Sequence, residues 1–90
     1  MIVLSTPRFD RAIKKISPPE KKAIDQVIRE IVGNPQKGEM KKGDLAGTRV
    51  YKFKFNKQQM LLAYSVSLNT TKMVLMGYGV HENFYRDLKR

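Results

Sequence analysis

The sequence lacks cysteine, lacks any long apolar run and contains few acidic residues. Without cysteine, disulfides and thiolate metal sites are excluded, and we expect neither a metal nor another cofactor. No apolar run approaches the roughly 20 residues that a bilayer-spanning helix needs, so we expect no membrane among the partners. The N-terminus has no basic start and no long apolar stretch typical of a secretory signal, so the cytoplasm is the expected location.

Basic residues are in large excess. The chain has 18 Lys and Arg against 8 Asp and Glu, a formal net charge of +10. Such an excess indicates a polyanionic partner, which means nucleic acid, an anionic membrane or an acidic protein. The excess is local as well as global, because residues 33–57 carry seven basic and two acidic side chains. This stretch favours a path for a phosphate backbone.

The length of 90 residues predicts a single domain over residues 1–90, with too little chain for two cores. Apolar residues make up 41% of the sequence, enough for a small packed core. The first third predicts a strand over 2–5 and then two helices. Thr6 can cap the first helix and Ser17 the second, where Glu20 completes a capping box. A proline follows each cap at the first helical position.

Apolar residues recur at helical spacing in both segments: Phe9, Ala12, Ile13 and Ile16, then Ile24, Val27, Ile28 and Ile31. Gly33 followed by Asn34-Pro35 predicts the end of the second helix, because glycine tolerates a left-handed C-terminal conformation and proline cannot continue a helix. The short connection between the helices predicts an antiparallel hairpin.

The rest of the chain reads as a loop, three strands and a tail. Residues 34–47 predict a glycine-containing basic loop anchored by Leu45. Three strands follow at about 48–55, 59–67 and 72–78, with a turn at Asn56-Lys57, and short connections make them antiparallel neighbours. Residues 81–90 predict a short helix, and Phe84 is its core candidate. The expected fold class is α+β, with a sheet packed on the helices.

The first of these strands alternates strictly. Tyr51, Phe53 and Phe55 point to one face, suited to a core, and Lys52 and Lys54 point to the other. By itself this pattern is more typical of a solvated strand that discourages aggregation. Two cations on a rigid surface together with the single histidine of the chain nevertheless suit a phosphodiester substrate.

Four segments together resemble the RelE/ParE superfamily of bacterial type II toxins. They are residues 45–47 (Leu-Ala-Gly), 51–55 (Tyr-Lys-Phe-Lys-Phe), 61–64 (Leu-Leu-Ala-Tyr) and 79–85 (Gly-Val-His-Glu-Asn-Phe-Tyr). The resemblance spans the whole chain in order and spacing. It implies a small fold in which a twisted antiparallel sheet packs against a helical hairpin.

The resemblance also implies a function. The RelE-like branch cuts messenger RNA in the ribosomal decoding (A) site without a metal, and the ParE-like branch poisons DNA gyrase. Both are neutralised by an antitoxin protein. The implied partners are therefore a cognate antitoxin, messenger RNA in the ribosomal A site and ribosomal RNA.

The resemblance suggests four catalytic residues. Lys52 and Lys54 occupy the positions of catalytic lysines in RelE. Tyr85 stands where the superfamily has a functional aromatic residue. His81 falls where RelE has an arginine and several sister toxins have a histidine. Leu61 is the departure, because it replaces an arginine of RelE.

An in-line attack of the 2′-hydroxyl on phosphorus needs a base, an acid and cations around the oxygens that gain charge. His81 could serve as acid or base near neutral pH. Lys52 and Lys54 could stabilise charge, and a lysine crowded by cations could itself be the base, so the choice between His81 and Lys54 stays open. Tyr85 could stack on a base or hydrogen-bond the phosphate. Further RNA-binding candidates are Arg49, Lys41, Lys42, Lys57 and Arg86.

Three functions follow in order of preference. The first is a ribosome-dependent, metal-independent endoribonuclease that acts as the toxin of a type II toxin–antitoxin pair. The second is a ParE-like gyrase inhibitor without nuclease activity. The third is a helix-turn-helix DNA binder, which the amphipathic character of both helices disfavours.

Overall fold

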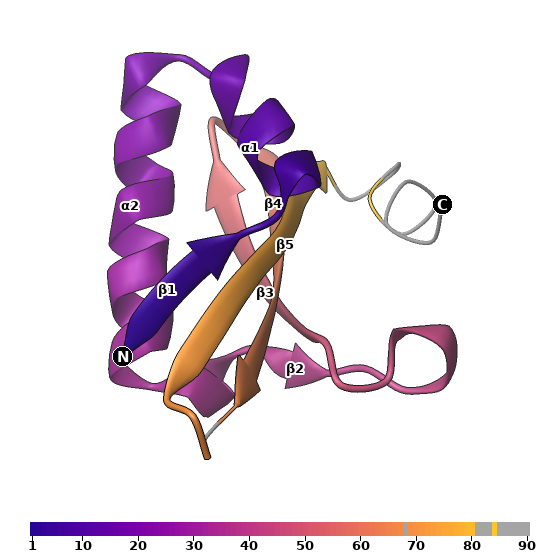
Figure 1. Ribbon diagram of the computed structural model, residues 1–90. Helices are drawn as coiled ribbons and strands as arrows, with labels where there is room; N and C mark the ends of the chain where they lie inside the picture. Colours follow the sequence, from indigo (N-terminus) through magenta and orange to yellow (C-terminus); the bar gives the residue numbers. More distant parts are fainter. Residues whose placement is uncertain (68, 81–83, 85–90) are drawn as a thin grey trace.

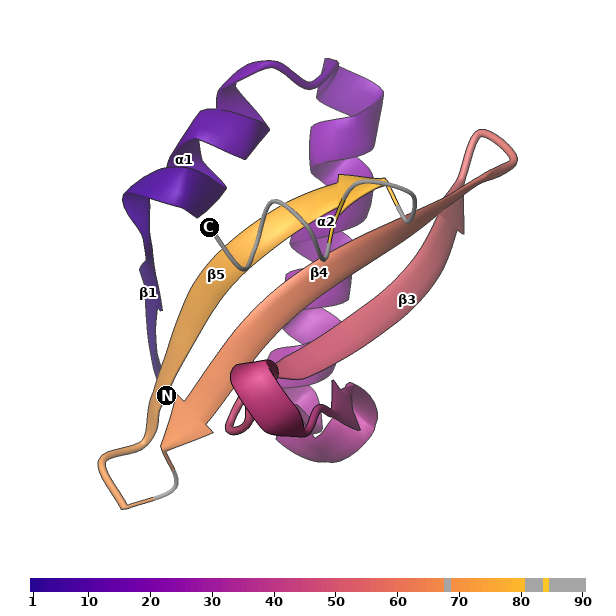
Figure 2. The ribbon, with the colours of Figure 1, turned by 90° about the vertical axis from the view of Figure 1, so that its right-hand side faces the viewer.

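The structure is a computed structural model that describes residues 1–67, 69–80 and 84. Within these residues, two α-helices lie on one side of a twisted five-stranded sheet with the strand order β1-β5-β4-β3-β2 (Figures 1 and 2). The elements are β1 (Ile2–Ser5), α1 (Pro7–Lys14), α2 (Pro18–Gly33), the short 3₁₀ helix η1 (Pro35–Lys37), β2 (Glu39–Met40), the 3₁₀ helix η2 (Gly43–Leu45), β3 (Arg49–Phe55), β4 (Gln58–Ser67) and β5 (Lys72–Val80). The α+β class predicted from the sequence is confirmed.

The two helices begin where their caps predict. The Thr6 side chain accepts a hydrogen bond from the Phe9 amide at 3.2 Å, and the Ser17 hydroxyl accepts one from the Glu20 amide at 3.5 Å. Each helix has proline in its first turn, where no intrahelical donor is lost. The helix α1 packs mainly on β5 and has few contacts with α2, so the helical hairpin is open.

The end of α2 differs from the prediction in its mechanism. The helix does end at Gly33, but its capping residue is Asn34, with φ −147°. Gly33 is not among the residues with positive φ, so the expected left-handed glycine is wrong. The Asn34 amide still bonds the Glu30 carbonyl, and Pro35 then starts η1. Proline, rather than a left-handed glycine, stops the helix.

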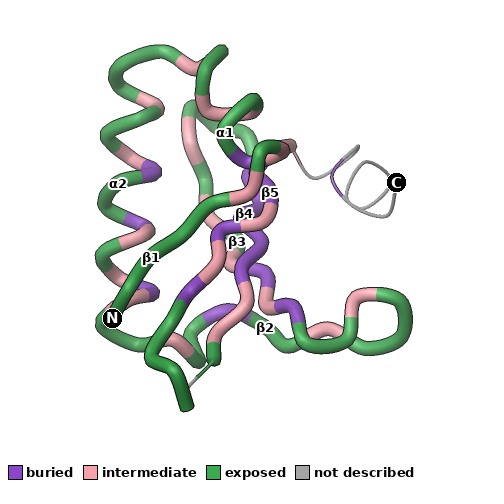
Figure 3. The backbone as a smooth tube through the Cα atoms, viewed as in Figure 1, coloured by how far each residue is buried: buried purple, intermediate pink, exposed green. Residues whose placement is uncertain are grey.

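The main core lies between the helices and the sheet (Figure 3). Its buried members are Phe9, Ile24, Val27, Ile31, Leu62, Tyr64, Met73 and Leu75. The inward face of α2 and alternate residues of β4 and β5 supply most of this set, as the two periodicities predict.

Three tyrosine hydroxyls of the sheet hold α2 and the segment after it. Tyr78 donates to the Glu20 carboxylate in the first turn of α2, and Tyr51 donates to Glu30 near its end at 3.1 Å. Tyr64 donates to the Pro35 carbonyl at 2.7 Å and accepts from the Gly38 amide at 2.9 Å. The buried polar tips are therefore satisfied, and the helix is fixed in register over the sheet.

A second, smaller cluster covers the face of the sheet that points away from the helices. Val50, Leu61, Ala63 and Phe84 are buried in it, and Met76 packs against them. Phe84 is only 5% exposed, which confirms it as a core residue. The predicted helix over 81–90 otherwise lies outside the described residues.

Two strand pairings differ from the expectations. The resemblance implied an antiparallel sheet, but β1 pairs in parallel with β5, with Val3 opposite Met73. The expected loop 34–47 contains β2, which pairs with β3. Leu45, the expected anchor of this loop, is half-buried, and nearby Thr48 is 5% exposed.

The hairpin turn between β3 and β4 matches its prediction. Asn56 and Lys57 have φ of 50° and 67°, the positive values that a two-residue type I′ turn requires at both positions. The turn sets Phe55 opposite Gln58 and fixes the register of every later pair between the two strands.

Candidate functional site

The strand β3 presents two exposed lysines on the face opposite the helices. Lys52 and Lys54 are exposed, whereas Tyr51 and Phe53 pack against the main core. Lys52 lies directly across from Leu61 of β4, and Lys54 lies across from Gln59. The alternation predicted from the sequence therefore holds, and both ammonium groups project from one surface, which we call the lysine face.

The lysine face is continuous with the second apolar cluster. Val50 and Leu61, which flank Lys52 along and across the strands, are 1% and 0% exposed. Phe84 packs on the same cluster and lies within van der Waals range of the position that a Cβ on Gly79 would occupy. Leu61, where the resemblance to RelE led us to expect an arginine, is a packing residue in this structure.

Glu39 belongs to this face, although the sequence did not single it out. It pairs with Val50 across β2 and β3, so its side chain points to the same side as Val50 and Lys52. Its carboxylate accepts a hydrogen bond from Lys41 at 3.0 Å. That hydrogen bond, the charge of Lys41 and then the charge of Lys52 lower the pKa of Glu39. The sequence did not reveal that Glu39 lies on this face, because β2 has only two residues and so shows no alternation of apolar and polar side chains.

Arg49 is placed away from the lysine face. It pairs with Tyr64, and its guanidinium donates to the carbonyls of Gln36 at 3.3 Å and Gly38 at 2.8 Å. These bonds hold the segment after α2 against the sheet. The geometry therefore gives Arg49 a structural task, and its role in RNA binding stays a prediction.

The remaining residues predicted to bind RNA or to catalyse cleavage either lie around the lysine face or fall outside the residues that the structure describes. Lys41 is joined to the site through Glu39, with 20% of its side chain exposed. Lys42 is exposed just before η2, and Lys57 is exposed in the turn after β3. His81, Tyr85 and Arg86 lie outside the described residues, so their positions stay predictions.

A separate set of charges lies on the helix side of the sheet. Glu30 accepts hydrogen bonds from Tyr51 and, at 3.3 Å, from Lys37; these bonds, that of Tyr51 first, lower its pKa. The same partnership raises the pKa of Lys37, whose ammonium lies 5.6 Å from the centre of the Tyr51 ring. Burial, and then the bond to Glu20, raises the pKa of Tyr78 far above its ordinary value. These groups fasten α2 rather than face the lysine surface.

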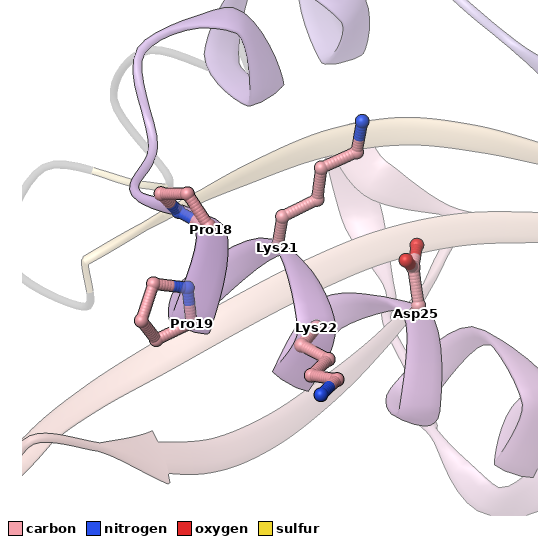
Figure 4. A pocket seen from close by; sticks show the side chains of 5 residues that line it. All are labelled: Pro18, Pro19, Lys21, Lys22 and Asp25. Carbon is pink, nitrogen blue, oxygen red and sulfur yellow. The ribbon is translucent and has the colours of Figure 1, made fainter.

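The start of α2 has an open hollow, lined by Pro18, Pro19, Lys21, Lys22 and Asp25 (Figure 4). Its prolines carry no amide hydrogen to offer a ligand. Among the described residues, no group of three or more His, Cys, Asp or Glu side chains could hold a metal ion. Within the same residues, neither helix has the length and apolar character needed to span a bilayer.

Comparison with known proteins places this architecture in a class of small α+β toxins. A family model described as the ParE-like toxin of type II bacterial toxin–antitoxin systems matches residues 3–89. The fold is similar to the intact E. coli RelBE toxin–antitoxin complex, with a TM-score of 0.71 at 16% identity over 90% of this chain and 96% of that chain. It is also similar to the isolated E. coli RelE toxin, with a TM-score of 0.69 at 16% identity over 90% of this chain and 84% of that chain.

The comparison with curated proteins gives no significant match. The family match covers nearly the whole sequence, so the chain belongs to the ParE-like toxins of type II toxin–antitoxin systems, within the RelE/ParE superfamily. The resemblance recognised from the sequence is confirmed.

Proposed function

We propose that this toxin is an endoribonuclease that cuts messenger RNA in the ribosomal A site, by in-line attack of a 2′-hydroxyl and without a metal. The observation that carries the proposal is the pair of exposed lysines on β3, fixed on one face by the pairs Lys52–Leu61 and Lys54–Gln59. Since a strand holds these side chains two residues apart on a rigid backbone, both can approach one phosphate and its neighbour.

The lysines would supply charge rather than covalent chemistry. In-line attack leaves extra negative charge on the phosphoryl oxygens, and preorganised cations next to these oxygens are worth several kcal/mol of transition-state stabilisation in a water-poor site. Val50 and Leu61, beside Lys52, are buried in the second apolar cluster and so support the strand that carries the lysines. With leucine in place of the RelE arginine, Lys52 and Lys54 carry this electrostatic task in our proposal.

His81 would move the proton, as acid or base, and Tyr85 would stack on a base or bind the phosphate. Two described neighbours support this assignment. Val80, the residue before His81, pairs with Met60 across β5 and β4. Met60 pairs on its other side with Phe53 of β3, which lies between Lys52 and Lys54 in the sequence. Phe84, the residue before Tyr85, packs on the cluster of the lysine face.

The proposed partners follow from charge. An antitoxin with an acidic segment would cover Lys52, Lys54 and the basic segment that contains Lys41 and Lys42. The similarity to a RelBE complex supports such a partner. The net charge of +10 supports contact with ribosomal RNA around the decoding site, where Lys57 and Arg86 would be further phosphate contacts.

The test is expression of the chain alone, followed by mapping of RNA ends. Codon-phased cuts in translated messages are expected, and His81→Ala and Lys54→Ala should each relieve growth arrest. Lys22→Ala, which removes an exposed lysine from α2, is the matched control and should stay toxic. If both site variants are as toxic as the control, the site assignment is wrong.

A second function is favoured by one observation, the ParE-like description of the matching family. In that case the toxin would inhibit DNA gyrase and leave RNA intact. Arrested replication, gyrase-linked DNA breaks and unbroken messages in the same experiment would support this alternative over the nuclease.

A further inference from the structure

The lysine face contains its own anion. Glu39 is the only carboxylate in the five strands described, and its pairing with Val50 places it beside Lys52. Its carboxylate bonds Lys41, which follows β2, at 3.0 Å, and the charge of Lys52 also acts on it and helps to lower its pKa. Glu39 differs in this from Glu20 and Glu30, whose carboxylates accept hydrogen bonds from tyrosines on the helix side of the sheet.

We propose that Glu39 is a built-in competitor for phosphate, which sits between Lys41 and Lys52 until RNA displaces it. The inference rests on the proposed function, because it takes the lysine face as the RNA site. A carboxylate and a phosphate compete for the same ammonium donors, as both accept charge-assisted hydrogen bonds. The Glu39 carboxylate is two-thirds exposed and can turn toward solvent when a phosphate arrives.

Competition from Glu39 would make the toxin favour RNA that is also held in place by contacts with the ribosome. An exposed ion pair contributes about 0–1 kcal/mol, so Glu39 would weaken RNA binding only a few-fold. Free single strands, which depend on a few phosphate contacts, would bind more weakly by this few-fold factor. A message fixed in the decoding site by the ribosome would be affected less. Glu39 is therefore a specificity-determining residue in this proposal.

The test is binding of a fluorescein-labelled single-stranded oligonucleotide with 2′-O-methyl riboses, which offers phosphates but cannot be cleaved through a 2′-hydroxyl. Fluorescence anisotropy over a series of salt concentrations gives affinity and its salt dependence. Glu39→Gln should bind about two- to fivefold more tightly than the original chain. The slope of log K against log salt should steepen by about 0.7 for each additional phosphate neutralised.

Glu30→Gln is the matched control, because it changes the net charge equally but removes a carboxylate from the helix side. A second control repeats Glu39→Gln in a Lys41→Gln, Lys52→Gln background, where the gain should disappear. Circular dichroism establishes that each variant is folded. Equal gains for Glu39→Gln and Glu30→Gln, or a gain that persists without the two lysines, would overturn the inference.

This experiment separates the inference from the proposed function. Because the oligonucleotide cannot be cut, a gain specific to Glu39→Gln stands even when no cleavage of translated messages is found. Conversely, codon-phased cleavage together with unchanged binding in Glu39→Gln would leave the nuclease intact and reject the role of Glu39.

Discussion

Lys52 and Leu61 are direct partners across β3 and β4, so an exposed ammonium stands beside a leucine that is 0% exposed. The two side chains differ in exposure because Lys52 extends into solvent, whereas Leu61 packs in the second apolar cluster. Leu61 belongs to the apolar cluster that contains Phe84.

An arginine at position 61 should therefore destabilise the protein. Leu61→Arg would bury a guanidinium among Val50, Ala63 and Phe84, and we expect it to cost 3 kcal/mol or more, about as much as leaving an unpaired charge inside a protein. Leu61→Ala should cost about 2–5 kcal/mol through lost burial and the cavity left behind. Urea denaturation measures both. An arginine variant as stable as the original chain would contradict this account of the cluster.

The contact between Gly38 and Tyr64 gives a second prediction. A Cβ on Gly38 would lie 2.7 Å from the Tyr64 hydroxyl oxygen, and Tyr64 is completely buried, so it has no room to withdraw. Gly38→Ala should cost about 1–3 kcal/mol. Tyr64→Phe should cost about 1–3 kcal/mol, because the Pro35 carbonyl and the Gly38 amide lose their partner.

A double variant separates steric conflict from general disturbance. In the Tyr64→Phe background the closest clash is removed, so Gly38→Ala should cost less there than alone. Gly33→Ala is the control, since nothing lies within 4 Å of its added Cβ and its φ is not positive. Thermal unfolding of the four variants measures the coupling, and strictly additive losses would contradict it.

The elements of this fold that follow local rules were predictable. Thr6 and Ser17 are the caps of the two helices, and the positive φ values at Asn56 and Lys57 form the expected turn. These features depend on neighbours in sequence. The alternation that exposes Lys52 and Lys54 belongs to the same group, because it needs only the period of a strand.

What could not be predicted depends on partners far along the chain. The parallel pairing of β1 with β5 and the strand β2 arise from tertiary pairing, and β2 is too short to show a pattern. The bonds of Arg49 to the carbonyls of Gln36 and Gly38 follow from its register opposite Tyr64, which the sequence did not predict, and its role in RNA binding stays a prediction. Glu39 was missed for the same reason, since the β2–β3 register alone brings it beside Lys52.

The pKa shifts at the end of α2 predict a pH dependence of stability. The hydrogen bonds from Tyr51 and Lys37 lower the folded-state pKa of Glu30 from 4.5. The contribution of Glu30 to the free energy of unfolding is therefore present above pH 4.5 and is lost as pH falls through the folded pKa. The pKa of Lys37 is raised from 10.5 in the folded state. Its contribution to the free energy of unfolding is therefore present below pH 10.5 and is lost as pH rises through the folded pKa.

The difference in unfolding free energy between the original chain and Glu30→Gln should thus be constant near neutral pH and vanish in acid. Denaturant titrations at a series of pH values measure this difference. Asp25→Asn, which removes an exposed carboxylate from the same helix, controls for net charge. A difference that grows as pH falls below 4.5 would have the wrong sign for this ion pair.

The role of Lys54 can be resolved by a substitution that keeps its charge. Arginine stays protonated at any physiological pH and cannot act as a base, but it can stabilise phosphoryl oxygens. If Lys54 acts through charge, as the proposal holds, Lys54→Arg should keep most of the cleavage rate on ribosome-bound message. Lys54→Met, which keeps length without charge, should lose about 10²–10³ in rate. Single-turnover cleavage measures the step directly, and an arginine variant as slow as the methionine variant would identify Lys54 as the base in place of His81.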